Sequence, residues 1–547
     1  MGKIRQGVVG EGSPIEGPFG PRPLVYADYV ASGRALDFVE EAVRAHVLPF
    51  YGNTHTETSF TGRETTRLRE MARASAKRAV GAGEQHAAIF TGSGATGAID
   101  KLIRAMGLYA PAHLHGKADA ERPVVFVGPY EHHSNDLQWR EALVDVERVP
   151  LDSEGQICLD TLERLLAKHE GRAKKIGAFS AASNVTGIKT NVRRLAALLH
   201  QHGALFFCDY AAGAPYMAID ITESAPGAGD QIDAIFLSPH KFIGGPGASG
   251  LLVADRALLC GKVPSVAGGG TVAYVTADHH VFVADAERRE EAGTPNIVAD
   301  IRTGIALELK SSVGAEEIER RESAIVAKVM QAFLAEPGIE VLGSPTAPRV
   351  GIFAFNIRAG GKTLHHGFVT ALLNDLFGIQ ARSGCSCAGP YAHDLLAIPA
   401  EQAARHEALV AGGESLLRPG WVRLGFNYFF SEETVDYIVS AVRFIARRGA
   451  DFLPLYKVDA RTGVWRMADA PTPRPASLTE LADIWSDAAP NEPSAAMPDF
   501  ATCLQLADEL ADVAAGRKSA AESALSREAE ELRWFWMPGE SVRAPAR

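Results

Sequence analysis

The sequence predicts an α/β fold: a large domain with a mostly parallel sheet, a smaller α+β domain and a C-terminal extension. Between about residues 85 and 260, short and continuously apolar runs alternate with stretches of helical spacing. This alternation is typical of a parallel sheet that is covered by helices on both faces. A chain of 547 residues also exceeds what one hydrophobic core accommodates, so we expect more than one domain.

The apolar runs of the large domain follow one another in a regular order. Six of them predict strands: residues 87–90, 124–127, 176–179, 204–208, 234–237 and 250–253. Between two of these runs, residues 192–199 have helical spacing, and this helix closes at Gly203. Ligands of such sheets bind beyond the carboxyl ends of the strands, so the residues found there are the first candidates for a site.

The smaller domain has a different pattern. An amphipathic stretch at residues 297–334 leads out of the large domain. After it we expect strands at residues 349–357, 379–381 and 421–426, and helices at residues 364–377 and after Ser431. Ser431 is a favourable N-cap, and the two glutamates that follow it suit the helix dipole. We therefore divide the chain into an irregular, Gly- and Pro-rich arm (1–25), the large domain (26–300), the smaller domain (301–450) and the extension (451–547).

The extension carries a Pro-rich piece at residues 470–476 and helical pieces at residues 503–515 and 520–534. The last helix is expected to end in Trp534-Phe535-Trp536, which is too apolar for a free tail. We expect this end to dock on the body of the protein. The sequence does not indicate what the extension does.

Composition narrows the class of protein. The net charge of -11 argues against nucleic acid as a main partner, because phosphate binding needs concentrated positive charge. No run approaches the roughly eighteen apolar residues of a membrane span, and the Met-Gly start lacks the apolar core of a signal peptide. The cysteines are few and scattered, at positions 158, 208, 260, 385, 387 and 503. We therefore expect a cytoplasmic protein with no disulfide framework and no membrane partner.

Two of the predicted strands end in residues of complementary chemistry. Asp209 ends one apolar run, and Lys241 lies just beyond another, in Ser238-Pro239-His240-Lys241. Pyridoxal phosphate needs both: a lysine forms the Schiff base, and an aspartate keeps the pyridine nitrogen protonated, so that the ring acts as an electron sink. A single lysine after a strand is more often a solvated surface residue. Because Asp209 ends a second strand, we favour a pyridoxal phosphate site over a surface lysine.

The segment from Gly92 to Gly97 follows the first predicted strand and formally fits the G-x-G-x-x-G pattern. A dinucleotide fold would need an acid about twenty residues later, at the end of the next strand. Here that strand ends in Gly128-Pro-Tyr-Glu131, which is too far along the chain. A glycine loop at a helix N-terminus nevertheless suits the phosphate of pyridoxal phosphate, and Thr96 adds a hydroxyl.

Glu131-His132-His133 follows the second predicted strand. In this context His132 is expected to stack on the pyridine ring and to move protons. A histidine pair is otherwise more often a surface or core feature. Zinc binding by these three residues would be chemically possible, but no companion ligand spacing supports it, and we expect no metal.

These residues together resemble a known family. Thr96, His132, Asn184, Asp209 and the segment ending in Lys241 occur in the order seen in class V aminotransferase-like pyridoxal phosphate enzymes, within the cysteine desulfurase and selenocysteine lyase group. The resemblance covers roughly residues 25–445.

The resemblance implies a fold-type I homodimer with active sites at the subunit interface. It also implies that Asn184 contacts cofactor and substrate, and that four residues surround the phosphate: Ala95, Thr96, Ser238 and His240. The segment Gly293-Thr-Pro-Asn296 resembles the one whose threonine reaches the neighbouring subunit's phosphate, which gives that role to Thr294.

The segment from Arg382 to Pro390 indicates the reaction. It resembles the desulfurase pattern R-x-G-x-x-C-A-x-P, which makes Cys387 the sulfur acceptor and makes alanine the product of L-cysteine. A thiolate on a loop is the nucleophile that this chemistry requires, and a nearby cation would increase the thiolate fraction. Two other interpretations remain: a metal-binding Cys-x-Cys pair, or buried cysteines that act as small hydrophobic residues.

Arg423, within a predicted strand, matches the arginine that binds the substrate carboxylate in this family, and Arg382 is expected to support the same region. Three features depart from the family pattern. Ala212 stands where a glutamine is usual, Cys385-Ser386 precedes the acceptor cysteine where histidines are frequent, and the C-terminal extension is unusual.

The sequence therefore predicts an enzyme for a small amino-acid substrate, with an acceptor protein as a further partner. Two alternatives stay open. One is another class V reaction, such as transamination, epimerisation or β-elimination, without a nucleophilic cysteine. The other is a non-catalytic scaffold that binds partners through its extension. The sequence does not decide between cysteine and selenocysteine.

Overall fold

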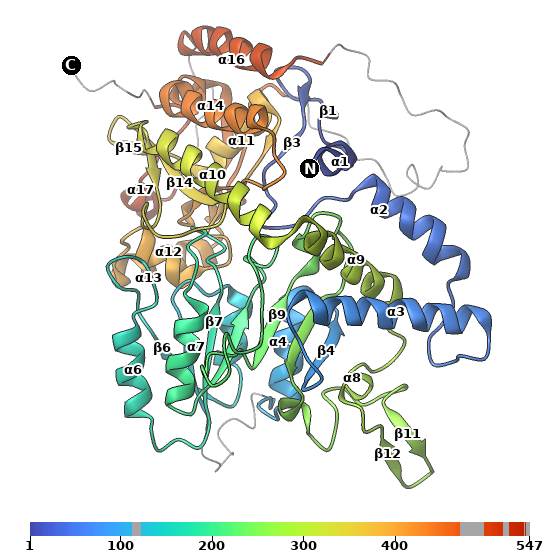
Figure 1. Ribbon diagram of the computed structural model, residues 1–547. Coiled ribbons are helices and arrows are strands. Elements are labelled where there is room, and N and C mark those ends of the chain that lie inside the picture. Colours follow the sequence, from blue (N-terminus) through green and yellow to red (C-terminus); the bar gives the residue numbers. More distant parts are fainter. Residues whose placement is uncertain (112–121, 471–496, 518–524, 541, 543–547) are drawn as a thin grey trace.

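The computed structural model describes the chain except residues 112–121, 471–496, 518–524, 541 and 543–547 (Figure 1). A seven-stranded sheet forms the larger half, in the order β4-β10-β9-β8-β7-β5-β6. Its strands are β4 (His86–Thr91), β5 (Val124–Val127), β6 (Asp145–Arg148), β7 (Lys175–Ser180), β8 (Leu205–Asp209), β9 (Ala234–Leu237) and β10 (Gly250–Asp255). Strands β5 to β9 are parallel, and β10 is antiparallel to both of its neighbours. The predicted α/β class and mostly parallel sheet are confirmed.

All six predicted strands of this sheet are present, because each is a continuous apolar run that is buried on both faces. Strand β6 has no such run and was not predicted. It lies at the edge of the sheet, where Asp145-Val-Glu-Arg148 stays only partly buried.

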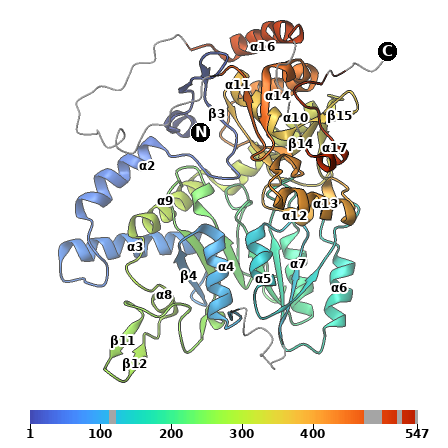
Figure 2. The ribbon, with the colours of Figure 1, turned by 180° about the vertical axis from the view of Figure 1, so that it is seen from behind.

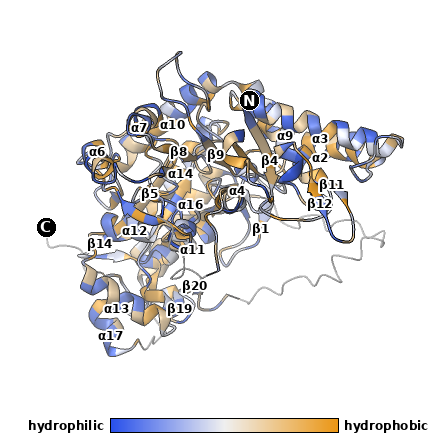
Figure 3. Cartoon of the chain, turned by 90° about the horizontal axis from the view of Figure 1, so that it is seen from below, coloured by the Kyte–Doolittle hydropathy of each residue, from blue (hydrophilic) through white to orange (hydrophobic). Residues whose placement is uncertain are grey.

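Helices cover both faces of the large sheet, as Figures 1 and 2 show from opposite sides. Alternate residues of each strand point to opposite faces, so the two hydrophobic clusters identify the helices on each side. One cluster joins the sheet to α3 (Phe60–Ala79), α6 (Leu159–Lys168), α7 (Val192–Gln201) and α9 (Ile297–Val313). The other joins it to α4 (Gly94–Ala105) and α5 (Leu137–Arg140). In Figure 3 hydrophobic and hydrophilic residues alternate along α3, as expected of a helix with one buried side.

The amphipathic stretch at residues 297–334 is two helices rather than one. Helix α9 ends at Val313, and α10 (Ala315–Leu334) begins after Gly314. Gly314 has a φ of 88°, a conformation that residues with a Cβ rarely adopt, so the chain turns at this point.

A second, antiparallel sheet forms the smaller half, with the order β13-β14-β18-β17 and with β15 beside β14. Its strands are β13 (Ile339–Val341), β14 (Ile352–Ala359), β15 (Lys362–Leu364), β17 (Arg382–Gly384) and β18 (Trp421–Gly425). Helices α11 (His366–Phe377) and α14 (Glu432–Arg448) pack with it in one core. The predicted start of α14 is confirmed, since the Ser431 side chain accepts a hydrogen bond from the Thr434 N–H.

The irregular arm expected over residues 1–25 contains regular structure. It holds α1 (Gly2–Gly7) and a pair of short strands, β1 (Pro14–Ile15) and β2 (Arg22–Pro23). The next strand, β3 (Val25–Tyr26), pairs in parallel with β16 (Ile379–Gln380). The prediction of an irregular arm was wrong because tertiary packing, in which Ile4 and Val8 join the core of the smaller half, outweighs the local Gly and Pro content.

The C-terminal extension packs on the smaller half. Phe500, the first residue of α16 (Phe500–Ala515), stacks on Tyr437 of α14 with 4.0 Å between ring centroids. The predicted docking of the aromatic end is confirmed, since Phe535 is fully buried and pairs with Thr363. This end follows a shorter helix than expected, α17 (Arg527–Leu532), and is itself extended. The Pro-rich piece, except Ala470, lies outside the described residues, as does part of the stretch at 520–534.

The remaining elements surround these two halves. They are α2 (Asp37–Ala42), α8 (Ala286–Arg289), α12 (Gly389–Leu395), α13 (Ala400–Ala411) and the two-stranded pairs β11–β12 (Val272–Val275, His280–Phe282) and β19–β20 (Tyr456–Asp459, Val464–Met467). In the described parts of the chain, no helix has the length and hydrophobicity to cross a membrane.

Candidate active site

A cavity of about 260 Å³ lies at the carboxyl ends of the parallel strands, facing the smaller sheet. Of the residues predicted from the sequence, the structure brings all but one to this cavity: Ala95, Thr96, His132, Asn184, Asp209, Ser238, His240, Lys241, Arg382, Cys387 and Arg423. The exception is Thr294. Ala212, the departure from the family pattern, also lines the cavity.

Asp209 is a buried carboxylate at the end of β8. One oxygen accepts a hydrogen bond from the Ala211 N–H at 2.8 Å. Burial raises the pKa of Asp209, while the neighbouring Lys241 and the Ala211 N–H lower it. Among the residues that the structure describes, no cation forms an ion pair with this carboxylate. Because a buried charge requires a partner, the position fits the protonated nitrogen of a pyridine ring.

Lys241 follows β9 in a single 3₁₀ turn, Pro239–Lys241. Burial, with a smaller contribution from Arg423, lowers the pKa of Lys241 to about 8, while Asp209 opposes the shift. At pH 7 about a tenth of the amine is therefore unprotonated, far more than for a lysine of ordinary pKa, and the unprotonated form is the one that acts as a nucleophile.

The N-terminus of α4 forms one end of the cavity, the predicted phosphate end. The Ala95 N–H donates to the Ser238 Oγ at 3.0 Å. Gly94 has a φ of 59°, and a Cβ at this position would lie 2.8 Å from the Ser238 Oγ and 2.7 Å from the His240 ring. Only glycine therefore permits this approach of backbone N–H groups, hydroxyl and imidazole. Such a cradle at a helix N-terminus fits a phosphate group.

His132 is held in one tautomer. Its Nδ1 accepts a hydrogen bond from the Ser134 N–H at 3.1 Å, so the proton of the neutral ring is on Nε2. Burial, with a contribution from Lys241, lowers the pKa of His132 to about 4. The Thr96 hydroxyl and the Ser134 hydroxyl, 2.7 Å apart, connect this histidine to the phosphate end. Ser134 was not predicted from the sequence.

Cys387 lies on a loop that is fastened to the large half of the molecule. The His133 N–H donates to the Cys387 carbonyl at 2.8 Å, and the Asn184 side chain donates to the Ser386 carbonyl at 2.8 Å. Ser386 and Cys387 have φ values of 53° and 57°, in the left-handed region. Cys387 is exposed and lines the cavity, whereas Cys385 packs against the hydrophobic core. The two thiols are therefore not equivalent.

Arg423 is almost completely buried, with 4% of its side chain exposed. One terminal nitrogen donates to the Asn184 carbonyl at 3.0 Å and the other to the Asp28 carboxylate at 3.1 Å. Arg382 donates to the second oxygen of Asp28 at 2.9 Å. Burial lowers the pKa of Arg423, and Asp28 opposes the shift. Asp28 was not predicted from the sequence, because it does not lie at the carboxyl end of a predicted strand of the large sheet.

Two buried polar atoms near Arg423 have no hydrogen-bond partner within the described ranges. They are the Arg423 Nε and the Asn184 Oδ1. A donor and an acceptor of this kind fit a substrate that carries a carboxylate and a polar group. The arrangement supports the predicted role of Arg423 in holding an amino acid.

Thr294 lies outside the cavity. Its hydroxyl accepts a hydrogen bond from the Asn53 side chain at 3.4 Å, and the residue lines an adjoining cavity with Gly92 and Ser93. The structure of one chain therefore does not bring Thr294 to the phosphate end, and its role across a subunit interface stays a prediction.

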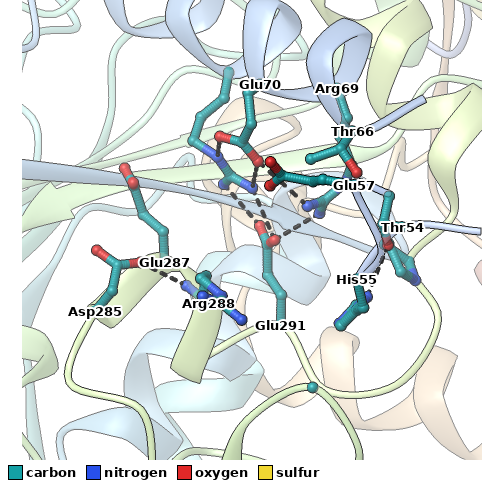
Figure 4. Close-up of a pocket in the computed structure, with 13 residues that line it drawn as sticks. Thr54, His55, Glu57, Thr66, Arg69, Glu70, Asp285, Glu287, Arg288 and Glu291 are labelled. Atoms are coloured by element: carbon teal, nitrogen blue, oxygen red, sulfur yellow. Dashed lines mark hydrogen bonds and ion pairs between the residues drawn. The ribbon is translucent and has the colours of Figure 1, made fainter. Parts of the chain in front are cut away.

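A further cavity of about 330 Å³ lies beside α3 (Figure 4). Arg69 pairs with Glu291 at 2.5 Å and with Asp300 at 2.7 Å, and Arg73 pairs with Glu291 at 2.9 Å and with Glu70 at 3.0 Å. These guanidinium groups already have carboxylate partners, and no residue of the predicted site lines this cavity. The candidate active site is therefore the cavity that contains Lys241.

Comparisons with known proteins identify the family of the chain. The family model described as aminotransferase class-V matches residues 25–438. The chain is 30% identical over 372 residues to a probable cysteine desulfurase of Halalkalibacterium halodurans, covering 67% of this chain and 85% of that protein. It is 29% identical over 373 residues to a cysteine desulfurase of Klebsiella pneumoniae, covering 68% and 85%.

Solved structures show the same fold. The apo cysteine desulfurase of Thermococcus onnurineus has a TM-score of 0.63 at 24% identity, over 78% of this chain and 95% of that one. The Escherichia coli cysteine desulfurase CsdA has a TM-score of 0.59 at 24% identity, over 76% and 93%.

Proposed function

Because the chain belongs to the aminotransferase class-V family of pyridoxal phosphate enzymes, we propose that it binds this cofactor and acts as a cysteine desulfurase. One observation carries the proposal: an exposed thiol, Cys387, lines the same cavity as the Lys241 amine and the Arg423 guanidinium. The substrate is L-cysteine, and the products are L-alanine and a persulfide on Cys387.

Three parts of the site would hold the cofactor. Lys241 would bind it covalently, Asp209 would pair with the ring nitrogen, and the N-terminus of α4 with Ser238 would bind the phosphate. When bound, pyridoxal phosphate supplies an electron sink that weakens the bonds at the carbon atoms of the amino acid. His132, neutral because its pKa is about 4, is suited to lie against the ring and to donate from Nε2.

The remaining groups act on the substrate. Arg423 binds its carboxylate and so directs the side chain toward Cys387. The Cys387 thiolate forms an S–S bond with the substrate sulfur while the substrate C–S bond breaks. The electron pair of that bond stays on the β-carbon, which takes a proton and becomes the methyl group of alanine. The Lys241 Nζ, with a pKa near 8, is placed to hold and return the protons that move.

The direct test is to incubate the cofactor-loaded protein with L-cysteine and to measure alanine and the mass of the peptide that contains Cys387. We expect alanine to form and this peptide to gain one sulfur atom. L-Serine, which has a hydroxyl in place of the thiol, serves as the control and should give no added mass. Alanine production without any persulfide at Cys387 would contradict the proposal.

The Asp209→Asn variant tests the cofactor site without measuring turnover. Cofactor affinity is expected to fall roughly 10- to 100-fold, because a charge-assisted hydrogen bond worth about 1.5–3 kcal/mol is lost. The apoprotein should melt at an equal or higher temperature than the parent. The raised pKa means that the charged carboxylate destabilises the folded apoprotein above pH 4, and asparagine removes this charge. A lower melting temperature with unchanged cofactor affinity would assign Asp209 a structural role instead.

We further propose a homodimer in which Thr294 of one chain contacts the cofactor phosphate of the other, and a separate protein that accepts the sulfur. Thr294 is exposed in the single chain, on a segment outside its own cavity. Thr294→Ala should weaken cofactor binding about tenfold and leave the sedimentation coefficient of the dimer unchanged. A monomeric protein with full cofactor affinity would refute the shared site.

A further inference from the structure

The loop that carries Cys387 is anchored on both sides of this residue. On one side, the Asn184 side chain donates to the Ser386 carbonyl at 2.8 Å. On the other side, the Gly389 N–H donates to Nε2 of the His133 ring at 3.1 Å. The His133 imidazole is therefore a side chain that holds the loop just after the thiol.

His133 contacts the loop twice, once through its backbone and once through its ring. Its backbone N–H donates to the Cys387 carbonyl at 2.8 Å. A Cβ on Gly389 would lie 3.3 Å from the His133 Nε2, so the loop backbone approaches the ring closely. The backbone hydrogen bond is available to any residue at position 133. A substitution of His133 therefore tests only the contact made by the ring.

The position of the ring is fixed by the turn to which it belongs. His133 begins a single 3₁₀ turn, His133–Asn135, which the His132 side chain caps. The Asn135 side chain donates to the Glu131 carboxyl group at 2.8 Å, and the Ser180 hydroxyl at the end of β7 donates to the same oxygen at 2.6 Å. Glu131 and Asn135 are both buried. The turn is thus attached to the large sheet and gives the loop a rigid support.

The His133 ring can hold the loop only while it is neutral. Its Nε2 accepts the Gly389 N–H, so the proton of the neutral ring is on Nδ1, and a protonated ring would have no acceptor. Burial lowers the pKa of His133, Arg140 contributes in the same direction, and Asp136 opposes the shift. The accepting form therefore predominates near neutral pH.

We propose that His133 is a positioning residue of the reaction: by accepting the Gly389 N–H, its imidazole holds the Cys387 thiol where it can reach the substrate sulfur. This inference rests on the proposed function and deepens it. The ring acts through the loop, since His133 does not line the cavity and Cys387 does. The thiolate must form an S–S bond as the substrate C–S bond breaks, and a small displacement of the nucleophile slows such a step strongly.

The test compares two substitutions that differ in hydrogen bonding. His133→Gln keeps an acceptor oxygen close to the position of Nε2, whereas His133→Leu has none. The cofactor-loaded protein is mixed with L-cysteine, and the rate of persulfide formation at Cys387 is measured in a single turnover. His133→Leu should lower this rate about tenfold or more, and His133→Gln should stay within about threefold of the parent. If His133→Leu folds poorly, His133→Phe takes its place, because it keeps a ring without an acceptor.

A second measurement separates the position of the thiol from its intrinsic reactivity. Alkylation of Cys387 by iodoacetamide in the absence of L-cysteine needs the thiolate but no alignment with a substrate. Its rate in His133→Leu should equal or exceed that of the parent, and the absorbance of the bound cofactor should be unchanged. His393→Gln is the matched control, because His393 lies exposed on α12, the helix that follows the loop. It should leave both rates unchanged.

Three results would overturn the proposal. A parental rate of persulfide formation in His133→Leu would show that the ring has no part in positioning the thiol. Equally slow persulfide formation in His133→Gln would show that the shape of the ring matters and its acceptor does not. Loss of cofactor absorbance together with persulfide formation would show that His133 only supports the neighbouring His132.

Amide hydrogen exchange of the peptide that contains Gly389 tests the same contact without turnover. Exchange should be faster in His133→Leu than in the parent and close to parental in His133→Gln. If this pattern is found but the parent forms no persulfide, the desulfurase assignment fails while the contact between His133 and the loop stands. If the parent forms persulfide but neither variant changes the exchange, only the inference on His133 fails.

Discussion

Replacement of Lys241 by alanine is expected to lower turnover by at least about a thousandfold and to abolish the covalent link between protein and cofactor. The lysine is the only group in the described part of the cavity that can both attach the cofactor and move protons at the substrate. Borohydride reduction followed by peptide mass analysis measures the link directly. In the parent protein the reduced cofactor should be found on the peptide that contains Lys241.

Lys310 provides a matched control. Burial also lowers its pKa, to about 7, but its amine donates to the Met217 carbonyl and the residue does not line the cavity. A lowered pKa alone therefore does not distinguish a cofactor lysine, and the proposal for Lys241 rests on its place after β9, in the same cavity as Asp209. Lys310→Met should keep the covalent link. Recovery of the reduced cofactor on Lys310, or on any lysine other than Lys241, would refute the assignment.

The second large effect concerns the two thiols of the active-site loop. Cys387→Ala is expected to abolish persulfide formation and to lower alanine production by at least about a hundredfold, while cofactor binding stays normal. We expect this loss because Cys387 lines the cavity, and without its sulfur the substrate sulfur has no acceptor. The rate of alanine formation and the absorbance of the bound cofactor are the two measurements.

Cys385→Ala is the control in the same loop. Its side chain packs against the hydrophobic core, so the variant should keep most of the activity and lose some stability. Equal loss of activity in both variants would indicate that Cys385 relays the sulfur. If Cys387→Ala turns over its amino acid normally, the enzyme belongs to the class V reactions that need no nucleophilic cysteine.

Much of this site could be predicted because parallel sheets convert sequence order into spatial proximity. Asp209 ends β8 and Lys241 lies in the turn that follows the neighbouring strand β9, so the order of the strands brings the two residues together. The Gly92–Gly97 loop was predictable for the same reason, since it follows β4 and begins α4. The local sequence was sufficient to predict these residues because each of them lies at the end of a strand or at the start of a helix.

Asp28 was not predictable in this way. Its partners Arg382 and Arg423 are more than 350 residues away, and the pairing of β3 with β16 that places it leaves no signal in a Gly- and Pro-rich segment. The fastening of the Cys387 loop by His133 and Asn184 is equally non-local. Sequence patterns report periodicity and capping, whereas these contacts depend on how two separate sheets are packed together.

Each of the two sheets contributes a different set of side chains to the site. Asp209 ends a strand of the seven-stranded sheet, and Lys241 and His132 follow two others, whereas Arg382 and Arg423 belong to strands of the smaller sheet. Asp28 is attached to the smaller sheet by its backbone neighbours. On the proposed function, the groups that bind the amino acid therefore belong to one half of the molecule and those that hold the cofactor to the other, so a rotation of one half against the other would separate them. The product would then leave between the two halves while the cofactor stays attached to Lys241. The next substrate would bind without the protein having to bind its cofactor again.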